Sequence, residues 1–281
     1  MNTETKKLGI IAGGGVLPRL LIEHCQKTNR PYSVLAIENN ADRSFFTPEI
    51  PHKWIRLGQA GTGFKIFGEQ KVNEIIMIGT INRPSFTDLL PDLRTAAFIA
   101  RIGLKSLGDD GILRAIIREI ESDNFRVVGI QDVLPELLVK QGLLTKRKPD
   151  KQALADIKRG MEVASQLGRL DVGQSVIVQQ GLVLGLEGIE GTDRLINRCA
   201  EYKRKGVGGV LVKLRKPQQD MRVDLPTIGE STVENLHKAG MRGIAIHAGN
   251  ALIVNEAQTI ALANKYGIFI VGIVPEEEDL A

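Results

Sequence analysis

Near the N-terminus the chain reads Leu8-Gly9-Ile10-Ile11-Ala12-Gly13-Gly14-Gly15-Val16-Leu17-Pro18, and this segment sets the fold class. A short apolar run ends in three glycines, and Pro18 suits the first turn of the helix that follows. Leu17, Leu20 and Leu21 recur at helical spacing. The segment therefore predicts a buried strand, a tight turn and a helix, which together open a parallel α/β sheet.

The same alternation continues to about residue 131. Further strands are expected at 32–37, 54–57, 75–79 and 126–130, with helices at 62–70, 93–102 and 112–121. Apolar strands that alternate with helices are typical of a parallel sheet covered on both faces. Aromatic residues make up only 4% of the chain, which fits an aliphatic core. Residues 1–131 are predicted to form a Rossmann-like N-terminal domain.

A second domain is expected after a break. Pro135, Gly142 and Pro149 interrupt the alternation, so 132–150 is interpreted as a linker. Beyond it, helices are expected at 151–167, 192–203, 230–239 and 255–265, and strands at 176–178, 183–186, 209–213, 243–246 and 267–273. Residues 151–281 are predicted to form a C-terminal α/β domain that carries the catalytic groups. Two domains also suit a length of 281 residues.

Composition limits the function classes. The net charge is only +4, but basic residues gather at 140–159 and 194–216, where they favour anionic ligands. Few aromatic residues are present for stacking on bases, so nucleic-acid binding is not expected. Cys25 and Cys199 are far apart, as in a reducing compartment. The N-terminus lacks an apolar signal segment, so a cytoplasmic protein is expected, peripheral on the inner membrane at most.

Glycines and polar residues follow two strands of the first domain. Gly13, Gly14 and Gly15 end the first strand, where a glycine-rich turn lets phosphate approach backbone N–H groups. Thr80, Asn82 and Arg83 follow the 75–79 strand and should face the same crevice. The G-x-G-x-x-G pattern of dinucleotide sites is not matched, because position 18 is Pro. The alternative is that the glycines only make a tight turn.

Two acidic segments precede predicted helices. At 108–111 the aspartates either cap the next helix or bind a polar ligand. At 186–193, Thr192 is expected to cap a helix, with Asp193 in its first turn, and the helix N-terminus could receive phosphate. Capping does not account for Glu187 and Glu190 in a glycine-rich loop.

The segment 213–229 is the richest in chemistry. Its prolines, Pro217 and Pro226, argue against a helix between them. If the segment were extended, Asp220 and Asp224 would lie about 13 Å apart, whereas a turn would bring them together. Carboxylates suit Mg²⁺, and the positive charges of Lys213, Lys216 and Arg222 would neutralise phosphate charge. The alternative is a solvated charged loop. His247, which follows the 243–246 strand, is expected to be structural.

Together the segments 8–18, 79–84, 108–114, 187–193 and 213–229 resemble the UDP-2,3-diacylglucosamine pyrophosphatase family of Gram-negative lipid A biosynthesis, the LpxI type. The resemblance covers nearly the whole chain, and 213–229 is its most specific part. It implies two α/β domains that hold a lipid-bearing UDP-sugar. It also implies hydrolysis of the pyrophosphate to UMP and 2,3-diacylglucosamine 1-phosphate (lipid X), with Mg²⁺ or Mn²⁺ as cofactor. The essential aspartate of the family corresponds to Asp224.

The predicted site combines both lines of reasoning. The predicted catalytic residues are Asp224, Asp220 and Lys213, and the predicted metal ligands are Asp224, Glu187 and Glu190. The predicted substrate-binding residues are Gly13, Gly14, Gly15, Thr80, Asn82, Arg83, Thr192, Asp193, Lys216 and Arg222. A homodimer is expected from the frequency of such oligomers. The rival functions are a non-catalytic nucleotide-sugar binder and a nicotinamide-dependent oxidoreductase.

Overall fold

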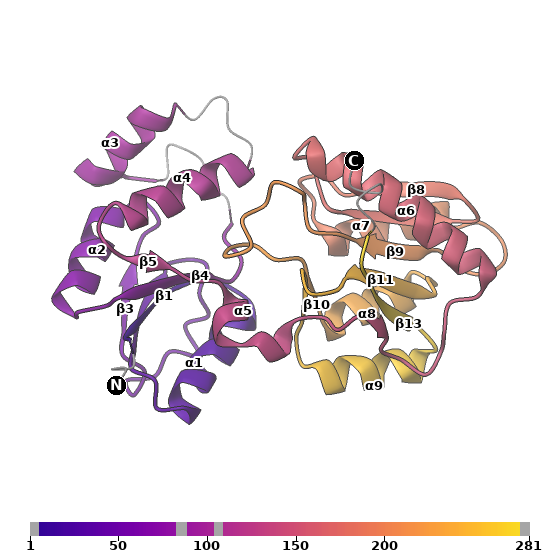
Figure 1. The fold of residues 1–281 in the computed structure, drawn as a ribbon, viewed down its shortest axis with the longest axis horizontal. Coiled ribbons are helices and arrows are strands. Elements are labelled where there is room, and N and C mark those ends of the chain that lie inside the picture. The colour runs from indigo at the N-terminus through magenta and orange to yellow at the C-terminus, as the bar shows by residue number, and fades with distance from the viewer. Residues whose placement is uncertain (1–5, 83–88, 104–108, 276–281) are drawn as a thin grey trace. The chain divides into compact units, whose positions relative to one another are not determined.

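The chain forms two compact units in the computed structural model, which describes residues 6–82, 89–103 and 109–275 (Figure 1). The first unit comprises Met1–Pro135 and Asp220–Asp224, and the second comprises Glu136–Gln219 and Leu225–Ala281. The second half of the chain thus returns one short segment, Asp220–Asp224, to the first unit. The predicted division into N-terminal and C-terminal halves did not foresee this return.

The first unit is built on a five-stranded sheet in the order β3-β2-β1-β4-β5. All of its neighbouring strands are parallel, and Ile10 in the central strand lies opposite Val34 and Ile76. The strands are β1 (Leu8–Ala12), β2 (Tyr32–Ile37), β3 (His52–Ile55), β4 (Glu74–Ile78) and β5 (Arg126–Val127). The predicted parallel α/β sheet is confirmed.

Helices cover both faces of this sheet. One face carries α1 (Leu17–Lys27), and the other carries α2 (Ala60–Glu69) and α4 (Asp109–Glu121), as Figure 1 shows. On the second face a core cluster contains Phe67 of α2 and Ile117 of α4. Val223, from the returning segment, is 5% exposed and belongs to this same cluster. The remaining helices are α3 (Leu93–Ile102) and the short α5 (Ile130–Val133).

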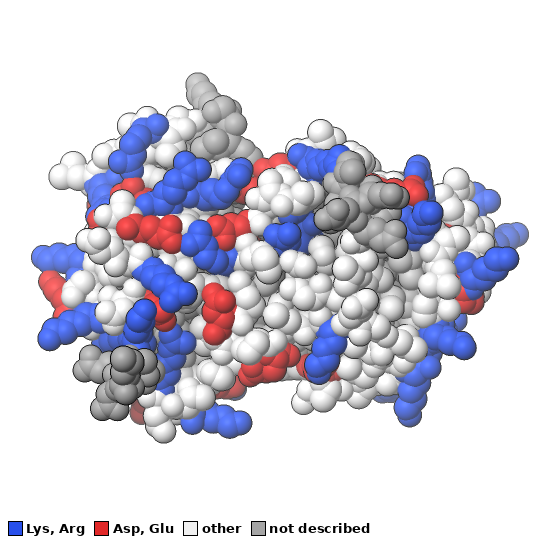
Figure 2. All heavy atoms as spheres, in the orientation of Figure 1, with Lys and Arg blue, Asp and Glu red and all other residues white. Residues whose placement is uncertain are grey.

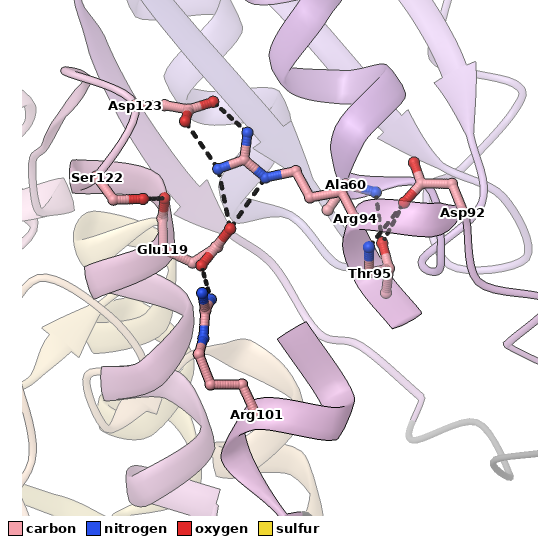
Figure 3. A network of polar contacts seen from close by, with 8 residues as sticks. All are labelled: Ala60, Asp92, Arg94, Thr95, Arg101, Glu119, Ser122 and Asp123. Carbon is pink, nitrogen blue, oxygen red and sulfur yellow. Dashed lines mark hydrogen bonds and ion pairs between the residues drawn. The ribbon is translucent and has the colours of Figure 1, made fainter. Parts of the chain in front are cut away.

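A network of charged side chains fastens α3 to α4 (Figure 3). Arg94 donates to both carboxylate oxygens of Asp123, and its Nε donates to Glu119 at 2.9 Å. Glu119 also pairs with Arg101. Asp92 caps α3 by accepting a hydrogen bond from the backbone of Thr95 at 2.8 Å. The helix is therefore held at its N-terminal end by capping and along its length by ion pairs.

The second unit has a six-stranded mixed sheet in the order β6-β13-β11-β9-β7-β8. Its middle strands β13, β11 and β9 are parallel, whereas β6, β7 and β8 pair with their neighbours in antiparallel fashion. The strands are β6 (Gly142–Leu143), β7 (Ser175–Gln179), β8 (Leu182–Leu186), β9 (Val210–Lys213), β11 (Gly243–His247) and β13 (Phe269–Ile273). A separate short parallel pair joins β10 (Thr227–Ile228) to β12 (Leu252–Ile253).

Helices again cover both faces of the sheet. The long α6 (Lys151–Arg169) covers one face through a cluster that includes Ala164 and Val212. The other face carries α7 (Thr192–Cys199), α8 (Glu230–Lys238) and α9 (Glu256–Tyr266), whose cluster includes Leu195 and Leu236. Two α/β units are therefore present, as predicted. In the part of the chain that the structure describes, no helix has both the length and the apolar character needed to cross a bilayer.

Several predicted boundaries shift. The strand predicted at 126–130 ends at Val127, because α5 begins at Ile130. The helix predicted from Ile112 begins at Asp109, so Asp109 and Asp110 form its first turn rather than preceding it; Gly108 lies outside the described residues. The stretch 132–150, expected to be a linker, contains the 3-10 turn Pro135–Leu137 and β6, which pairs with β13.

Candidate functional site

Lys213 lies at the carboxyl end of β9, where its ammonium group donates to oxygen atoms of two described residues. The residue is 7% exposed. Its Nζ donates to the Thr192 hydroxyl at 2.9 Å and to the Thr227 carbonyl at 3.1 Å. The Thr192 hydroxyl donates in turn to Glu187 at 2.6 Å. A buried acid, a hydroxyl and a lysine thus form a continuous chain at one edge of the sheet. In open α/β sheets this carboxyl edge is where ligands bind.

Glu187 acts as the fixed end of this chain. Its second carboxylate oxygen accepts a hydrogen bond from the Gln174 backbone at 3.1 Å, and the residue is 7% exposed. The Ser175 hydroxyl lies 3.3 Å from that of Thr192. Both Glu187 oxygens accept hydrogen bonds, and through Thr192 the carboxylate helps to position Lys213.

Thr192 occupies a different helix position from the one predicted. Gly191, with a φ of 79°, is the N-cap of α7, and Thr192 is the first helical residue. The cap needs a backbone conformation that glycine adopts without strain. The Thr192 side chain is therefore directed to Glu187 and Lys213, while Asp193 is exposed in the first turn.

Glu190 lines a surface groove of about 590 Å³ in the second unit. Its carboxylate accepts hydrogen bonds from its neighbour Gly188 at 3.1 Å and from Arg198 at 2.7 Å. Backbone hydrogen bonding, followed by the Arg198 contact, lowers the pKa of Glu190. The groove is lined by Leu167, Val172, Leu186, Glu187, Gly188, Glu190, Arg194 and Arg198. The lining combines apolar side chains with two arginines, which suits a ligand with both apolar and anionic parts.

The loop after β9 packs against the end of α6. Lys216 is 8% exposed and pairs with Asp171 at 2.7 Å, and Gln218 donates to the Gly168 carbonyl at 2.7 Å. No helix forms between Pro217 and Pro226, as predicted from the two prolines. The loop is thus anchored within the second unit before the chain passes to the first.

Asp220 and Arg222 lie in the returning segment of the first unit. Arg222 donates through its backbone and its guanidinium to Asp220, with the closest contact at 2.7 Å, and also pairs with Glu121 of α4 at 2.6 Å. The hydrogen bonds from Arg222 lower the pKa of Asp220. The Val223 backbone donates to the Asp220 carbonyl at 3.2 Å, so the segment turns rather than extends. Asp220 therefore stabilises this turn, through its carboxylate bonds with Arg222 and its carbonyl bond with Val223.

Asp224 is exposed and has a left-handed backbone, with a φ of 57°. Its neighbours Val223 and Leu225 are 5% and 7% exposed, so burial on both sides fixes this conformation. Left-handed backbones are uncommon for residues other than glycine and are often found at functional sites. Within residues 6–82, 89–103 and 109–275, the histidines, cysteines and acids form no group of three that could hold a metal. One carboxylate is nonetheless enough for Mg²⁺, which keeps waters and binds substrate phosphate.

The triple glycine is explained by close backbone approach. Gly13 donates to the Ile78 carbonyl at 2.8 Å, and Gly14 exchanges backbone hydrogen bonds with Thr80 at 2.8 and 2.9 Å. A Cβ atom on Gly13 would lie 2.5 Å from the Thr80 carbonyl oxygen, and Gly15 has a φ of 86°. The turn therefore joins β1 to β4 where the strand order reverses, which is the usual ligand position of this fold.

A hollow of about 420 Å³ begins at this turn. It is lined by Gly13 and Gly15, by polar residues of α1 and by the loop after β2 that includes Asp42 and Ser44. The backbone N–H of Asn82 donates to the Asn40 side chain at 2.7 Å, which fixes the loop after β4. Arg83, also predicted to bind substrate, lies outside the described residues.

Sequence patterns did not identify several partners of these residues. The Thr227 carbonyl, the Gln174 backbone and the Ser175 hydroxyl surround the Lys213 chain, and Glu121 holds Arg222. Thr227 lies inside the segment 213–229 but acts through its backbone carbonyl, and the other partners lie outside the segments singled out from the sequence, because contacts through backbone atoms or across long sequence separations leave no local signal.

Comparison with known proteins gives matches along nearly the whole chain. Residues 7–137 match the family described as the LpxI N-terminal domain, and residues 140–271 match the LpxI C-terminal domain. A relative from Caulobacter vibrioides, named UDP-2,3-diacylglucosamine pyrophosphatase LpxI, is 37% identical over 279 residues. The match covers 97% of this chain and 99% of the relative.

Proposed function

Since the chain belongs to the LpxI family, we propose that it is an enzyme that hydrolyses the pyrophosphate bond of UDP-2,3-diacylglucosamine. The products would be UMP and 2,3-diacylglucosamine 1-phosphate (lipid X), as a step of lipid A biosynthesis. The observation that carries the proposal within the structure is the buried chain from Glu187 through Thr192 to Lys213. It presents a fixed cation at the ligand edge of the second unit.

Lys213 would stabilise negative charge on the phosphoryl group that is transferred. A cation fixed before the reaction stabilises the transition state without reorganisation. Its position is set by Thr192 and by the Thr227 carbonyl, so the ammonium group does not need to be ordered when substrate arrives. Lys216, similarly buried, would add positive charge from the same loop.

Asp224 would hold a divalent cation, Mg²⁺ or Mn²⁺, together with water and the substrate phosphates. The metal would supply Lewis-acid polarisation of the phosphoryl oxygens and a more acidic bound water. The left-handed backbone keeps the Asp224 carboxylate exposed between two buried neighbours. In the second unit, Glu187 would hold Thr192 and Lys213 in position, and Glu190 would line the groove beside Arg198; both were predicted as further metal ligands.

The first unit would contribute to substrate binding through the hollow that begins at Gly13 and Gly15. The groove beside Glu190, with its apolar lining residues, would accept part of the lipid. On the visible face in Figure 2, Lys and Arg of the second unit lie around an area of uncharged surface. Such an arrangement would favour peripheral binding to the anionic inner membrane.

Product analysis in ¹⁸O-labelled water tests the reaction. The purified chain is incubated with UDP-2,3-diacylglucosamine, and mass spectrometry identifies which product carries the label. UMP and the sugar 1-phosphate are expected, with release stopped by EDTA and restored by Mg²⁺ or Mn²⁺. Substrate that is bound but never cleaved would instead establish a nucleotide-sugar binder.

Asp224→Asn tests the role assigned to Asp224. Asn tolerates the left-handed backbone but lacks the charge, so the fold should persist while kcat falls about 10²–10³-fold. Glu234→Gln, at an exposed position of α8, is the matched control and should retain wild-type turnover. Wild-type turnover by Asp224→Asn would overturn the assignment.

A further inference from the structure

Arg215 is a partly buried cation without a carboxylate partner in the described part of the chain. Within the described residues, its NH1 donates to the Gln219 carbonyl at 3.1 Å and its buried Nε has no acceptor. Two other arginines that are not exposed, the intermediate Arg94 and the buried Arg242, each pair with two carboxylates. Burial lowers the pKa of Arg215, and no acid contributes in the opposite direction. A charge removed from water without compensation is costly, so this position calls for an anion.

His247 offers a second hydrogen-bond donor without an acceptor. The residue is 6% exposed, and its Nε2 lies 3.2 Å from the side-chain nitrogen of Asn250. That Asn250 nitrogen also lies 3.5 Å from the Ala248 carbonyl, which supports its assignment as the amide NH₂ group. An NH₂ group only donates, so Nε2 accepts and the proton of the neutral ring is on Nδ1. Nδ1 is buried and has no partner among the described residues.

The two donors lie close to one another at the ligand edge of the sheet. The strands β9 and β11 are parallel neighbours, with Lys213 opposite Ile246. Arg215 follows the carboxyl end of β9, and His247 is the last residue of β11. Burial, together with the positive charge of Arg215, lowers the pKa of His247 to about 4, so the ring is neutral near pH 7. A neutral ring donates a hydrogen bond without placing a second charge beside the guanidinium.

We propose that Arg215 and His247 form an oxyanion subsite that binds a phosphate group of the substrate or product. Its occupant would accept hydrogen bonds from Arg215 Nε and His247 Nδ1 and would neutralise the arginine. Guanidinium groups suit phosphate because they donate in a planar fork. The assignment to substrate rests on the proposed function, whereas the binding of phosphate does not.

Side-chain NMR of the full chain, labelled with ¹⁵N, tests this subsite directly. Inorganic phosphate, UMP and glucosamine 1-phosphate are titrated separately while the Arg215 Nε–H and His247 Nδ1–H signals are followed. We expect both signals to shift with inorganic phosphate. Tighter binding of UMP would assign the subsite to the nucleotide phosphate, and tighter binding of glucosamine 1-phosphate to the sugar phosphate. No shift with any of the three would overturn the proposal.

Variants separate this role from a structural one. Arg215→Gln should weaken phosphate binding about tenfold or more, because a charge-assisted contact is lost. Its thermal stability should be equal or higher, since an uncompensated buried charge is removed. Arg159→Gln, an exposed arginine of α6 that pairs with Glu162, is the matched control and should bind phosphate like the wild type. Equal phosphate affinity in Arg215→Gln and the wild type would contradict the subsite.

Two changes at His247 test the donor atom. In His247→Asn the amide NH₂ takes the place of Nδ1–H and should preserve phosphate binding, whereas His247→Phe should weaken it. Equal binding by both variants would contradict the role of Nδ1.

Kinetics keep the two proposals distinct. If the chain cleaves UDP-2,3-diacylglucosamine and Arg215→Gln keeps the wild-type KM and kcat, the subsite is wrong for this reaction while the enzyme assignment stands. If no substrate is cleaved, the phosphate titration still decides whether the subsite exists.

Discussion

At the scale of single residues, the Thr192 hydroxyl joins two charged side chains and also lies 3.3 Å from the Ser175 hydroxyl. It donates a hydrogen bond to the Glu187 carboxylate and accepts one from the Lys213 ammonium group. The position of Lys213 therefore depends on that of Glu187 through this single oxygen atom. Glu187 and Lys213 are each 7% exposed, so water could not easily replace the hydroxyl as their hydrogen-bond partner. The lysine position thus depends on an uncharged residue.

Thr192→Val should damage both stability and turnover. The methyl group that replaces the hydroxyl leaves Lys213 and Glu187 each with one fewer partner, which costs about 1–3 kcal/mol in free energy of unfolding. Turnover should fall mainly in kcat, because Lys213 acts on charge that develops in the transition state. Urea unfolding and steady-state kinetics measure the two effects. Thr192→Ser retains the hydroxyl and should stay near wild type; equal behaviour of Ser and Val variants would refute the relay.

The residue scale also shows what sequence patterns can identify. Glu187, Thr192 and Lys213 stood out because polar residues followed predicted strands or preceded a predicted helix. The link between them was not predictable, since Thr192 and Lys213 are far apart in sequence. Thr192 was assigned to the N-cap because threonine is common there, but Gly191 takes that position with a positive φ.

At the scale of elements, α6 packs so closely on the sheet that one helix position requires glycine. A Cβ atom on Gly160 would lie 2.4 Å from Cγ2 and 2.9 Å from Cβ of Val212 in β9. Valine is stiff at χ1 and cannot rotate away without disturbing its own packing. The close approach brings the helix against the strand that ends in Lys213, so packing at Gly160 helps to fix the position of the site.

Gly160→Ala should therefore destabilise the protein, although alanine favours helix. We expect a loss of about 1–3 kcal/mol from overpacking, measured by thermal or chemical unfolding. Gly68→Ala in α2 is the opposite control, because a Cβ there meets nothing within 4 Å, and it should stabilise by up to about 1 kcal/mol. Combining Gly160→Ala with Val212→Ala should recover part of the loss; no recovery would assign the effect to another contact.

Elements with a clear period were predictable. The α6 helix was expected at 151–167 and runs to Arg169, and β2 and β4 lie within one residue of their predicted ranges, whereas β3 (His52–Ile55) begins before its predicted range of 54–57 and β5 ends early at Val127. The short strand β6 was not predicted, since two residues carry no alternation and its pairing with β13 depends on tertiary structure. Helix ends were also shifted, as at Asp109, where polar residues lie inside the helix rather than before it.

At the scale of the whole molecule, the first unit draws on two separate parts of the chain. Asp220–Asp224 belongs to it, and Val223 packs in its core with residues of α2 and α4. Sequence patterns predicted two domains but assigned 220–224 to the second, because the stretch lies among second-domain elements and its two apolar residues, Met221 and Val223, alternate with charged ones. The packing of Val223 and the ion pair between Arg222 and Glu121 of α4 show where the segment belongs.

Val223→Ala should weaken the first unit by about 2 kcal/mol. Hydrogen exchange followed by mass spectrometry should show faster exchange in β1, β2 and β4, whose core the side chain joins. Val233→Ala, at a fully buried position of α8, is the matched change in the second unit and should accelerate exchange there instead. Faster exchange confined to the second unit in Val223→Ala would contradict the assignment of this segment.

The return of Asp220–Asp224 to the first unit also sets an order for synthesis. On the ribosome, residues up to Pro135 emerge early with most of their unit, but Val223 follows only after the chain from Glu136 to Gln219 has been translated. Until Val223 has been synthesised, the apolar core residues of the first unit that pack against it stay exposed. By then a large part of the second unit has also been translated. The last piece of the first unit arrives together with Asp224, so the unit is completed at the moment when the proposed catalytic aspartate is delivered.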